Sequence, residues 1–144
     1  MNDSSPASPT AIAFRVLGAA HEVEARMEAA LGGLGLSLAK FNVLSRLAEA
    51  GEPLPLSQLA DRCSCVRSNM TQLVDRLEAE RLVERAADPA DRRSVRAVLT
   101  EAGRERHAEA AGALELAGRA MFAHLGDEDR AELTRIVQLL ARQP

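Results

Sequence analysis

The chain has 144 residues, of which 47% are hydrophobic and 27% charged, and its formal net charge at pH 7 is −3. That length suits one domain with a single core, and the composition is that of a folded globular protein and not of a disordered one. Aromatic residues make up only 2%, with no Trp or Tyr. This disfavours binding of single-stranded DNA or RNA by stacking of bases on aromatic side chains.

No apolar run approaches the length of a membrane span, and no signal peptide opens the chain. We therefore expect a cytoplasmic protein that does not bind membranes. In that compartment the two cysteines are expected to be reduced thiols and not a structural disulfide.

A first helix is predicted over Pro9–Leu31, where apolar residues recur every three or four positions. Pro9 suits its first turn. The helix is expected to end at Gly32, Gly33 and Gly35, because glycine accepts the positive φ that many helix C-termini adopt.

Two further helices are predicted before the middle of the chain. Ser37 is a suitable N-cap for the second helix, which is expected to end at Gly51. A third, short helix is expected over Leu56–Arg62, with Pro55 at its start, where proline is tolerated. The second helix has one apolar side, formed by Leu38, Phe41, Leu44, Leu47 and Ala48.

The next amphipathic segment predicts a fourth helix with one apolar and one polar face. The apolar stripe comprises Met70, Leu73, Val74 and Leu77. At 100° per residue, the residues opposite the stripe or on its flanks are Ser68, Asn69, Thr71, Gln72, Asp75 and Arg76. Such side chains suit base edges in a major groove, where Asn or Gln binds adenine and Arg binds guanine. The alternative is an ordinary solvated helix face.

Two short runs rich in β-branched residues, Leu82–Arg85 and Val95–Leu99, predict a hairpin that leans on these helices. Pro89 favours a turn between them, and Asp88 can close that turn through its own side chain. The hairpin tip then carries Arg92 and Arg93, which suit phosphates or a narrow minor groove. In the alternative interpretation the tip is a solubilising turn whose aspartates and arginines neutralise one another.

Positive charge is concentrated in this region although the chain as a whole is acidic. Residues 62–106 hold ten arginines against eight Asp and Glu, a net charge of +2, and the rest of the chain carries −5. Neutralising a DNA backbone needs only a local basic patch, so the overall acidity does not exclude DNA as a partner.

Two helices are predicted after the hairpin. Thr100 is expected to cap a long helix from Glu101 to about Leu125, and a last helix is expected over Asp127–Ala141. The last helix has an apolar stripe of Leu133, Ile136, Val137 and Leu140. Apolar stripes on the N- and C-terminal helices indicate a shared two-fold interface with a second copy. An intramolecular helix bundle is the alternative.

Four segments of the chain together resemble the MarR family of bacterial winged helix-turn-helix regulators. They read LSLAKFNVLSRLAEAGEPL, LSQLADRC, MTQLVDRLEAERLVER and DPADRRSVRAVLTEAG. In the last segment Asp91 and Arg93 match the D-x-R motif of the family's wing, in which the Arg enters the minor groove and the Asp holds it in position. The resemblance also implies a homodimer formed through the terminal helices.

The sequence thus predicts a mainly α fold with a small β-hairpin wing, as a single MarR-type domain over residues 1–144. Residues 9–31 and 101–142 are expected to form the dimerisation helices, and residues 36–100 the winged helix-turn-helix lobe.

The predicted function is sequence-specific binding of double-stranded DNA at a pseudo-palindromic operator by a homodimeric transcription regulator, most readily a repressor. A soft metal ion, an oxidant or a small organic effector would release it, and no cofactor is required. The predicted DNA-binding residues are Arg67, Ser68, Asn69, Thr71, Gln72, Arg76, Asp91, Arg92 and Arg93. The alternatives are a non-specific architectural DNA-binding protein and a thiol-based redox enzyme, although no βαβ pattern or paired base supports the enzyme.

Cys63 and Cys65 lie in the turn of the helix-turn-helix, where related sequences usually have apolar residues. Three interpretations are open: small buried hydrophobic side chains, redox sensors, or two ligands for a soft metal such as Cu(I). His21, His107 and His124 are distant in sequence and are interpreted as ordinary helix residues. Val66 replaces the capping Ser that is common in the family, which leaves the start of the fourth helix open.

Overall fold

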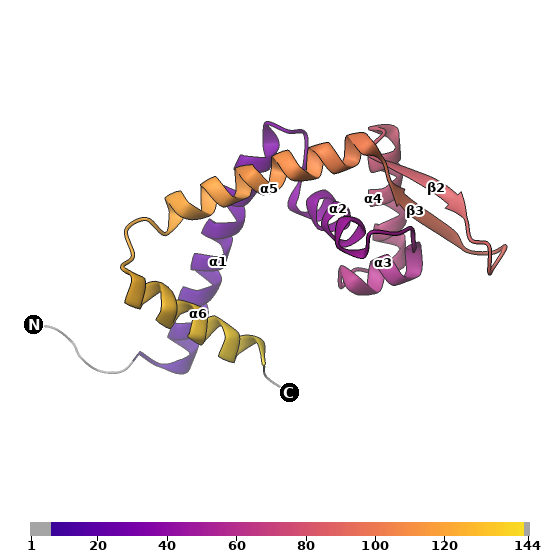
Figure 1. Ribbon diagram of the computed structural model, residues 1–144. Coiled ribbons are helices and arrows are strands. Elements are labelled where there is room, and N and C mark those ends of the chain that lie inside the picture. The colour runs from indigo at the N-terminus through magenta and orange to yellow at the C-terminus, as the bar shows by residue number, and fades with distance from the viewer. Residues whose placement is uncertain (1–6, 143–144) are drawn as a thin grey trace, which may run out of the picture.

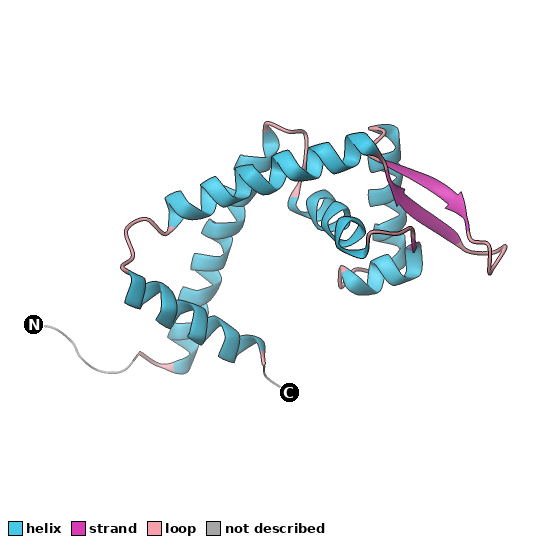
Figure 2. Cartoon of the chain, in the orientation of Figure 1, coloured by secondary structure: helices cyan, strands magenta, loops and turns pink. Residues whose placement is uncertain are grey.

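A computed structural model describes residues 7–142 of the chain. Its elements are α1 (Pro9–Gly32), α2 (Leu38–Ala50), β1 (Leu54–Pro55), α3 (Leu56–Arg62), α4 (Arg67–Ala79), β2 (Val83–Ala87), β3 (Val95–Leu99), α5 (Glu101–Met121) and α6 (Asp127–Ala141). Figure 1 shows a lobe of α2, α3, α4 and the sheet, and an arm built of α1, α5 and α6. The predicted fold class, mainly α with a small β wing, is confirmed (Figure 2).

The apolar core lies in the lobe. Its fully buried side chains include Leu44, Leu59, Met70, Leu77 and Val83, which come from α2, α3, α4 and β2. By contrast, every residue of α6 is exposed. Within residues 7–142 none of the helices is both long enough and apolar enough to cross a membrane.

Most of the predicted helix caps are present. The hydroxyl oxygen of Ser37 accepts a hydrogen bond from the Lys40 N–H at 3.2 Å, and Gly51 ends α2 with φ of +65°. The prediction for the end of α1 was partly wrong, because its C-cap Gly33 is right-handed with φ of −64°. The positive φ lies at Gly35, in the turn that leads to α2.

The sheet has three strands where the sequence predicted two. β1 pairs antiparallel with β3 through Leu54↔Ala97 and Pro55↔Arg96, so the strand order is β1-β3-β2. Pro55 lacks an N–H, which confines β1 to the sheet edge. β2 also begins and ends later than predicted, at Val83–Ala87.

α5 begins against the turn that ends α4. The Thr100 hydroxyl donates to the Arg81 carbonyl oxygen at 2.8 Å and accepts from the Gly103 N–H at 2.9 Å, which confirms the predicted cap. A Cβ atom on Gly103 would lie 2.0 Å from the carbonyl oxygen of Leu82. Only glycine therefore allows α5 to approach the lobe this closely.

At its far end α5 stops at Met121, earlier than the predicted Leu125. The N–H of Leu125 instead donates to the Phe122 carbonyl oxygen at 3.1 Å, in the turn that leads to α6. Nothing in the local sequence breaks the helix there, so the end was not predictable from propensity alone.

Candidate nucleic-acid interface

α4 lies with its apolar stripe in the core and its polar face in solvent. Met70, Val74 and Leu77 are fully buried. The helix begins at Arg67, directly after Val66, although Val66 provides no side-chain cap. The exposed residues of its outward face include all the predicted contacts, Arg67, Ser68, Asn69, Thr71, Gln72 and Arg76.

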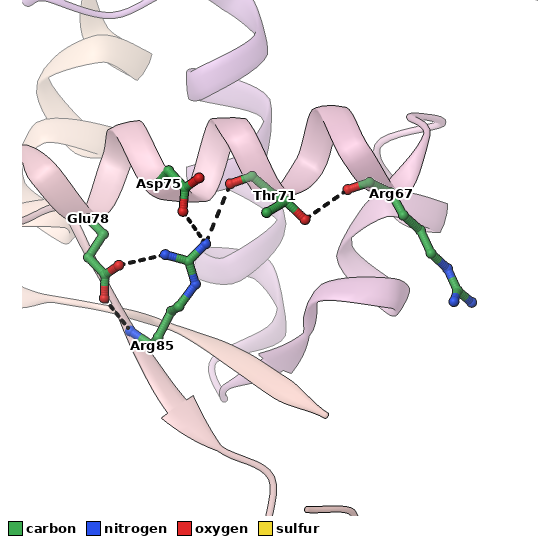
Figure 3. Close-up of polar contacts among 5 residues, drawn as sticks. All are labelled: Arg67, Thr71, Asp75, Glu78 and Arg85. Atoms are coloured by element: carbon green, nitrogen blue, oxygen red, sulfur yellow. Dashed lines mark hydrogen bonds and ion pairs between the residues drawn. The ribbon is translucent and has the colours of Figure 1, made fainter. Parts of the chain in front are cut away.

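A groove of about 380 Å³ separates the N-terminal half of α4 from the wing. It brings together Arg67 and Thr71 of α4 with Asp91 and Arg93 of the β2–β3 turn. The remaining residues of its lining are Leu56, Ser57, Ser94 and Val95. Figure 3 shows the Arg67 side chain extending away from α4, while the Thr71 hydroxyl donates to the Arg67 carbonyl oxygen at 3.1 Å.

The other predicted contacts of α4 lie on a different side of the helix. Asn69, Gln72 and Arg76 line a second hollow of about 280 Å³, together with Cys65 and Ala39 of α2. The predicted recognition residues therefore do not converge on one point. They cover two adjoining sides of α4, as expected of a helix that contacts both walls of a groove.

Asp91 shapes the wing tip through a main-chain contact. Its Oδ1 atom accepts a hydrogen bond from the Arg93 N–H at 2.9 Å, and the Ser94 N–H donates to its carbonyl oxygen at 3.0 Å. Arg92 and Arg93 are exposed. In the described part of the chain no carboxylate lies within ion-pair distance of either arginine, which argues against the self-neutralised turn.

Asp88 braces the base of the same turn. Its Oδ1 atom accepts from the Ala90 N–H at 2.9 Å, which confirms the predicted side-chain closure, and lies 3.1 Å from Nη2 of Arg96 on β3. The Ala90 N–H first, and then Arg96, hold the pKa of this carboxyl below its usual value. The wing is therefore tied across its two strands by an ionised aspartate.

Three residues of this region were not predicted from the sequence. Ser57 and Ser94 line the groove beside Arg93. Arg85 of β2 contacts the outward side of α4. The position of Ser57 in the first turn of α3 could have indicated that it lies in this region. The partners of Arg85, by contrast, depend on how β2 packs against α4.

Cys63 and Cys65 are free, half-buried thiols that pack against the core. The Cys65 thiol faces the Val66 carbonyl oxygen at 3.4 Å. Burial raises the pKa of the Cys63 thiol, and the nearby Arg46 guanidinium only partly opposes this. Little Cys63 thiolate is therefore present at neutral pH, which favours the packing interpretation over redox sensing for that residue.

The histidines lie apart from the thiols. His107 stacks on Phe41 with ring centroids 5.2 Å apart, and its Nε2 lies 2.9 Å from the Ser45 hydroxyl oxygen. His21 and His124 are exposed on the arm. Among residues 7–142 no group of three or more His, Cys, Asp or Glu side chains is arranged to hold a metal ion.

Comparison with known proteins finds relatives of this lobe. The MarR family sequence model matches residues 34–94. The chain is 39% identical over 69 residues to the HTH-type transcriptional regulator MhqR of Bacillus subtilis (strain 168), a match that covers 48% of this chain and 47% of the relative. The matched segment thus spans about half the length of that curated relative.

Solved structures match nearly the whole chain. A MarR family transcriptional regulator from Streptomyces coelicolor, in complex with DNA, superimposes with a TM-score of 0.82 and 28% identity, covering 97% of this chain and 94% of that one. CouR from Rhodococcus jostii RHA1, bound to p-coumaroyl-CoA, gives a TM-score of 0.78 and 27% identity, covering 97% and 98%. The lobe, the wing and the helical arm are thus similar, over nearly the whole chain, to solved structures of MarR family regulators.

Proposed function

We propose that this protein is a homodimeric transcription regulator that binds double-stranded DNA in a sequence-specific manner and acts as a repressor. The main support is the groove in which Arg67 and Thr71 of α4 face Asp91 and Arg93 of the wing. With α4 in a major groove of the DNA and the basic wing tip in the adjacent minor groove, both walls of the protein groove would contact DNA at once. The matched relatives are named as transcriptional regulators and not as enzymes.

Each predicted contact residue takes a role in this proposal. Arg67, Ser68, Asn69, Thr71 and Gln72 contact bases or phosphates in the major groove, and Arg76 contacts a phosphate. Arg93 enters the minor groove, Arg92 contacts a phosphate beside it, and Asp91 fixes the shape of the tip.

Dimerisation through α1, α5 and α6 is the second part of the proposal. The arm exposes large apolar side chains, Phe14, Leu17, Leu116, Leu133, Ile136, Val137, Leu139 and Leu140. Such a surface on a free chain marks an interface, and the exposure of all of α6 argues against an intramolecular bundle. A two-fold dimer would present two copies of α4 to a pseudo-palindromic operator. Its expected compartment is the cytoplasm.

We further propose that a small organic molecule is the effector. The related CouR is bound to p-coumaroyl-CoA. Binding of such a molecule would shift the dimer between two spacings of its α4 helices, only one of which fits the operator.

An oxidant or a soft metal acting on Cys63 and Cys65 is the second candidate effector, because both thiols lie in the turn directly before α4. Peroxide and Cu(I), titrated separately against a DNA complex, should dissociate the wild type and spare the Cys63→Ser, Cys65→Ser double variant if the thiols are sensors. Equal behaviour of both proteins would remove the thiols from the mechanism.

The proposed function is tested by mapping protected DNA upstream of the gene that encodes this chain. We expect the wild type to protect a bounded, pseudo-palindromic segment, and an Arg67→Ala, Arg93→Ala double variant to protect none of it at the same concentration. Uniform protection along the whole fragment would instead indicate the non-specific architectural protein.

A further inference from the structure

Arg85 of β2 joins the sheet to α4 through two ion pairs. Its Nη2 atom lies 2.5 Å from Oδ1 of Asp75, and its Nη1 atom lies 2.6 Å from Oε2 of Glu78. The main-chain N–H of Arg85 donates to Oε1 of Glu78 at 3.3 Å, and Nη2 makes a longer contact of 3.5 Å to the Thr71 carbonyl oxygen. Figure 3 shows the guanidinium lying along the helix between these acceptors. Its rigid fork of donors thus holds α4 from residue 71 to residue 78.

These contacts lie between the strand ladder that carries the wing tip and the helix that forms the opposite wall of the groove. β2 and β3 pair from Val83↔Leu99 to Ala87↔Val95, and Arg85 lies in the middle of this ladder, which carries the wing tip. Thr71 belongs both to the groove wall and to the partners of Arg85. A change in the angle between β2 and α4 would therefore move Arg93 relative to Thr71.

The apolar contacts between α4 and β2 define the angle between these two elements less strictly than hydrogen bonds do. Val74 and Leu77 of α4 and Val83 of β2 are fully buried, and their packing holds the helix against the sheet. Apolar packing is not directional, whereas hydrogen bonds to a planar guanidinium are. The Arg85 side chain is only 27% exposed, but Asp75 is 57% exposed. Partly exposed ion pairs contribute little to global stability. Loss of the Arg85 ion pairs should therefore change the angle between β2 and α4 and leave the free energy of unfolding nearly unchanged.

We propose that Arg85 is a positioning residue for DNA reading. It sets the angle at which the wing stands from α4, so that both elements fit one half-site, and it does not contact DNA itself. Asp75 then has two opposed effects: its charge on the outward side of α4 repels phosphates, while its ion pair holds Arg85 in place. This inference rests on the proposed function.

The direction in which Asp75→Asn changes DNA affinity distinguishes repulsion of phosphates by Asp75 from positioning of Arg85 by Asp75. Two duplexes serve as probes: one selected by the wild type from a randomised library, and one with the same bases shuffled. Loss of a carboxylate near DNA should strengthen binding to both if only charge matters. Positioning by Arg85 instead requires affinity for the selected duplex to fall by about fivefold to tenfold, while affinity for the shuffled duplex stays equal or rises.

Glu84→Gln is the matched control, because it removes one negative charge from the exposed neighbour of Arg85 without touching these ion pairs. It should leave the preference for the selected duplex unchanged. Thermal unfolding of each variant, monitored by circular dichroism, confirms that it is folded before affinities are compared.

Arg85→Gln provides the second measurement. It should weaken binding to the selected duplex by about tenfold, and adding Asp75→Asn should weaken it no further, because both changes remove the same contact. The salt dependence should stay that of the wild type, since no phosphate contact is lost, whereas loss of a phosphate-bound arginine lowers the slope by about 1.

Two results would overturn the positioning role: stronger binding of both duplexes by Asp75→Asn, or a lowered salt slope in Arg85→Gln. If the wild type itself fails to prefer the selected duplex, the proposed function fails first, before any variant is compared.

Discussion

In the proposed function, Arg93 is the wing side chain that we expect to matter most for DNA binding. It is exposed at the tip, lines the groove beside Arg67 and is held only through its main-chain N–H by Asp91. Arg93→Ala should weaken DNA binding by about 1–3 kcal/mol and leave the fold intact, because a groove-inserted cation is lost and no core is touched. Titration of a labelled operator duplex measures this. Unchanged affinity in a folded variant would remove the wing from the mechanism.

Asp88 makes the wing sensitive to acid. Because the Ala90 N–H and Arg96 lower the pKa of this carboxyl in the folded chain, its stabilising effect is present above the pKa of the unfolded chain and is lost as pH falls below that value. The protection of the Ala90 amide against hydrogen exchange, relative to the intrinsic rate at each pH, should therefore decrease as pH falls below the ordinary aspartate value of about 3.9. In Asp88→Asn the amide should exchange faster than in the wild type at neutral pH, with a weaker change on acidification. A wild-type amide whose protection does not change with pH would contradict this assignment.

Residue-level prediction from the sequence succeeded where a local rule applied. The outward face of α4 follows from helical periodicity, and the closure of the Asp88 turn follows from short-range hydrogen bonding. The partners of Arg85 lie seven to fourteen residues away, on another element, and no periodic rule links them. Their contact depends on tertiary packing, which the sequence pattern does not encode in a readable way.

At the scale of elements, the junction between α5 and the lobe depends on one glycine. A Cβ on Gly103 would meet the main chain of Leu82, which cannot move without displacing the turn after α4. Gly103→Ala should therefore destabilise the protein by about 1–3 kcal/mol, as overpacking does. Urea unfolding measures the change.

Gly112→Ala on the same helix is the control, because within residues 7–142 of the single chain nothing lies within 4 Å of the added Cβ. It should stabilise the protein by about 0.5–1 kcal/mol through helix propensity. Equal effects of the two substitutions would show that the close approach at Gly103 is not what fixes α5.

Capping residues made several element boundaries predictable, and the predicted bounds of α3, α6 and β3 are also confirmed although no side chain caps these two helices. Ser37 and Thr100 mark the starts of their helices, and Gly51 marks the end of α2, as expected. β1 has only two residues, too few for a pattern, and exists because β3 offers an edge. The end of α5 at Met121 is followed by a turn in which the Leu125 N–H donates to the Phe122 carbonyl oxygen, and no capping residue marks it.

We expect a second copy of the chain to cover the apolar arm of the molecule. Ile136 on α6 is 42% exposed, within an apolar face that the single chain leaves uncovered. Ile136→Glu should convert a dimer at micromolar concentration into monomer, because a carboxylate would be buried without a partner. Sedimentation measures the mass, and Arg135→Gln, on the adjacent helix position, is the control. A stable Ile136→Glu dimer would move the interface away from α6.

In the proposed dimer, two α4 helices read DNA as a symmetric pair. Selection of bound duplexes from a randomised library by the wild type, followed by measurement of the mass of the complex, tests it most directly. We expect enrichment of an inverted repeat whose half-sites lie about one helical turn apart, bound by two protomers. A library that stays random after repeated selection, or a selected site bound by a single protomer, would contradict it.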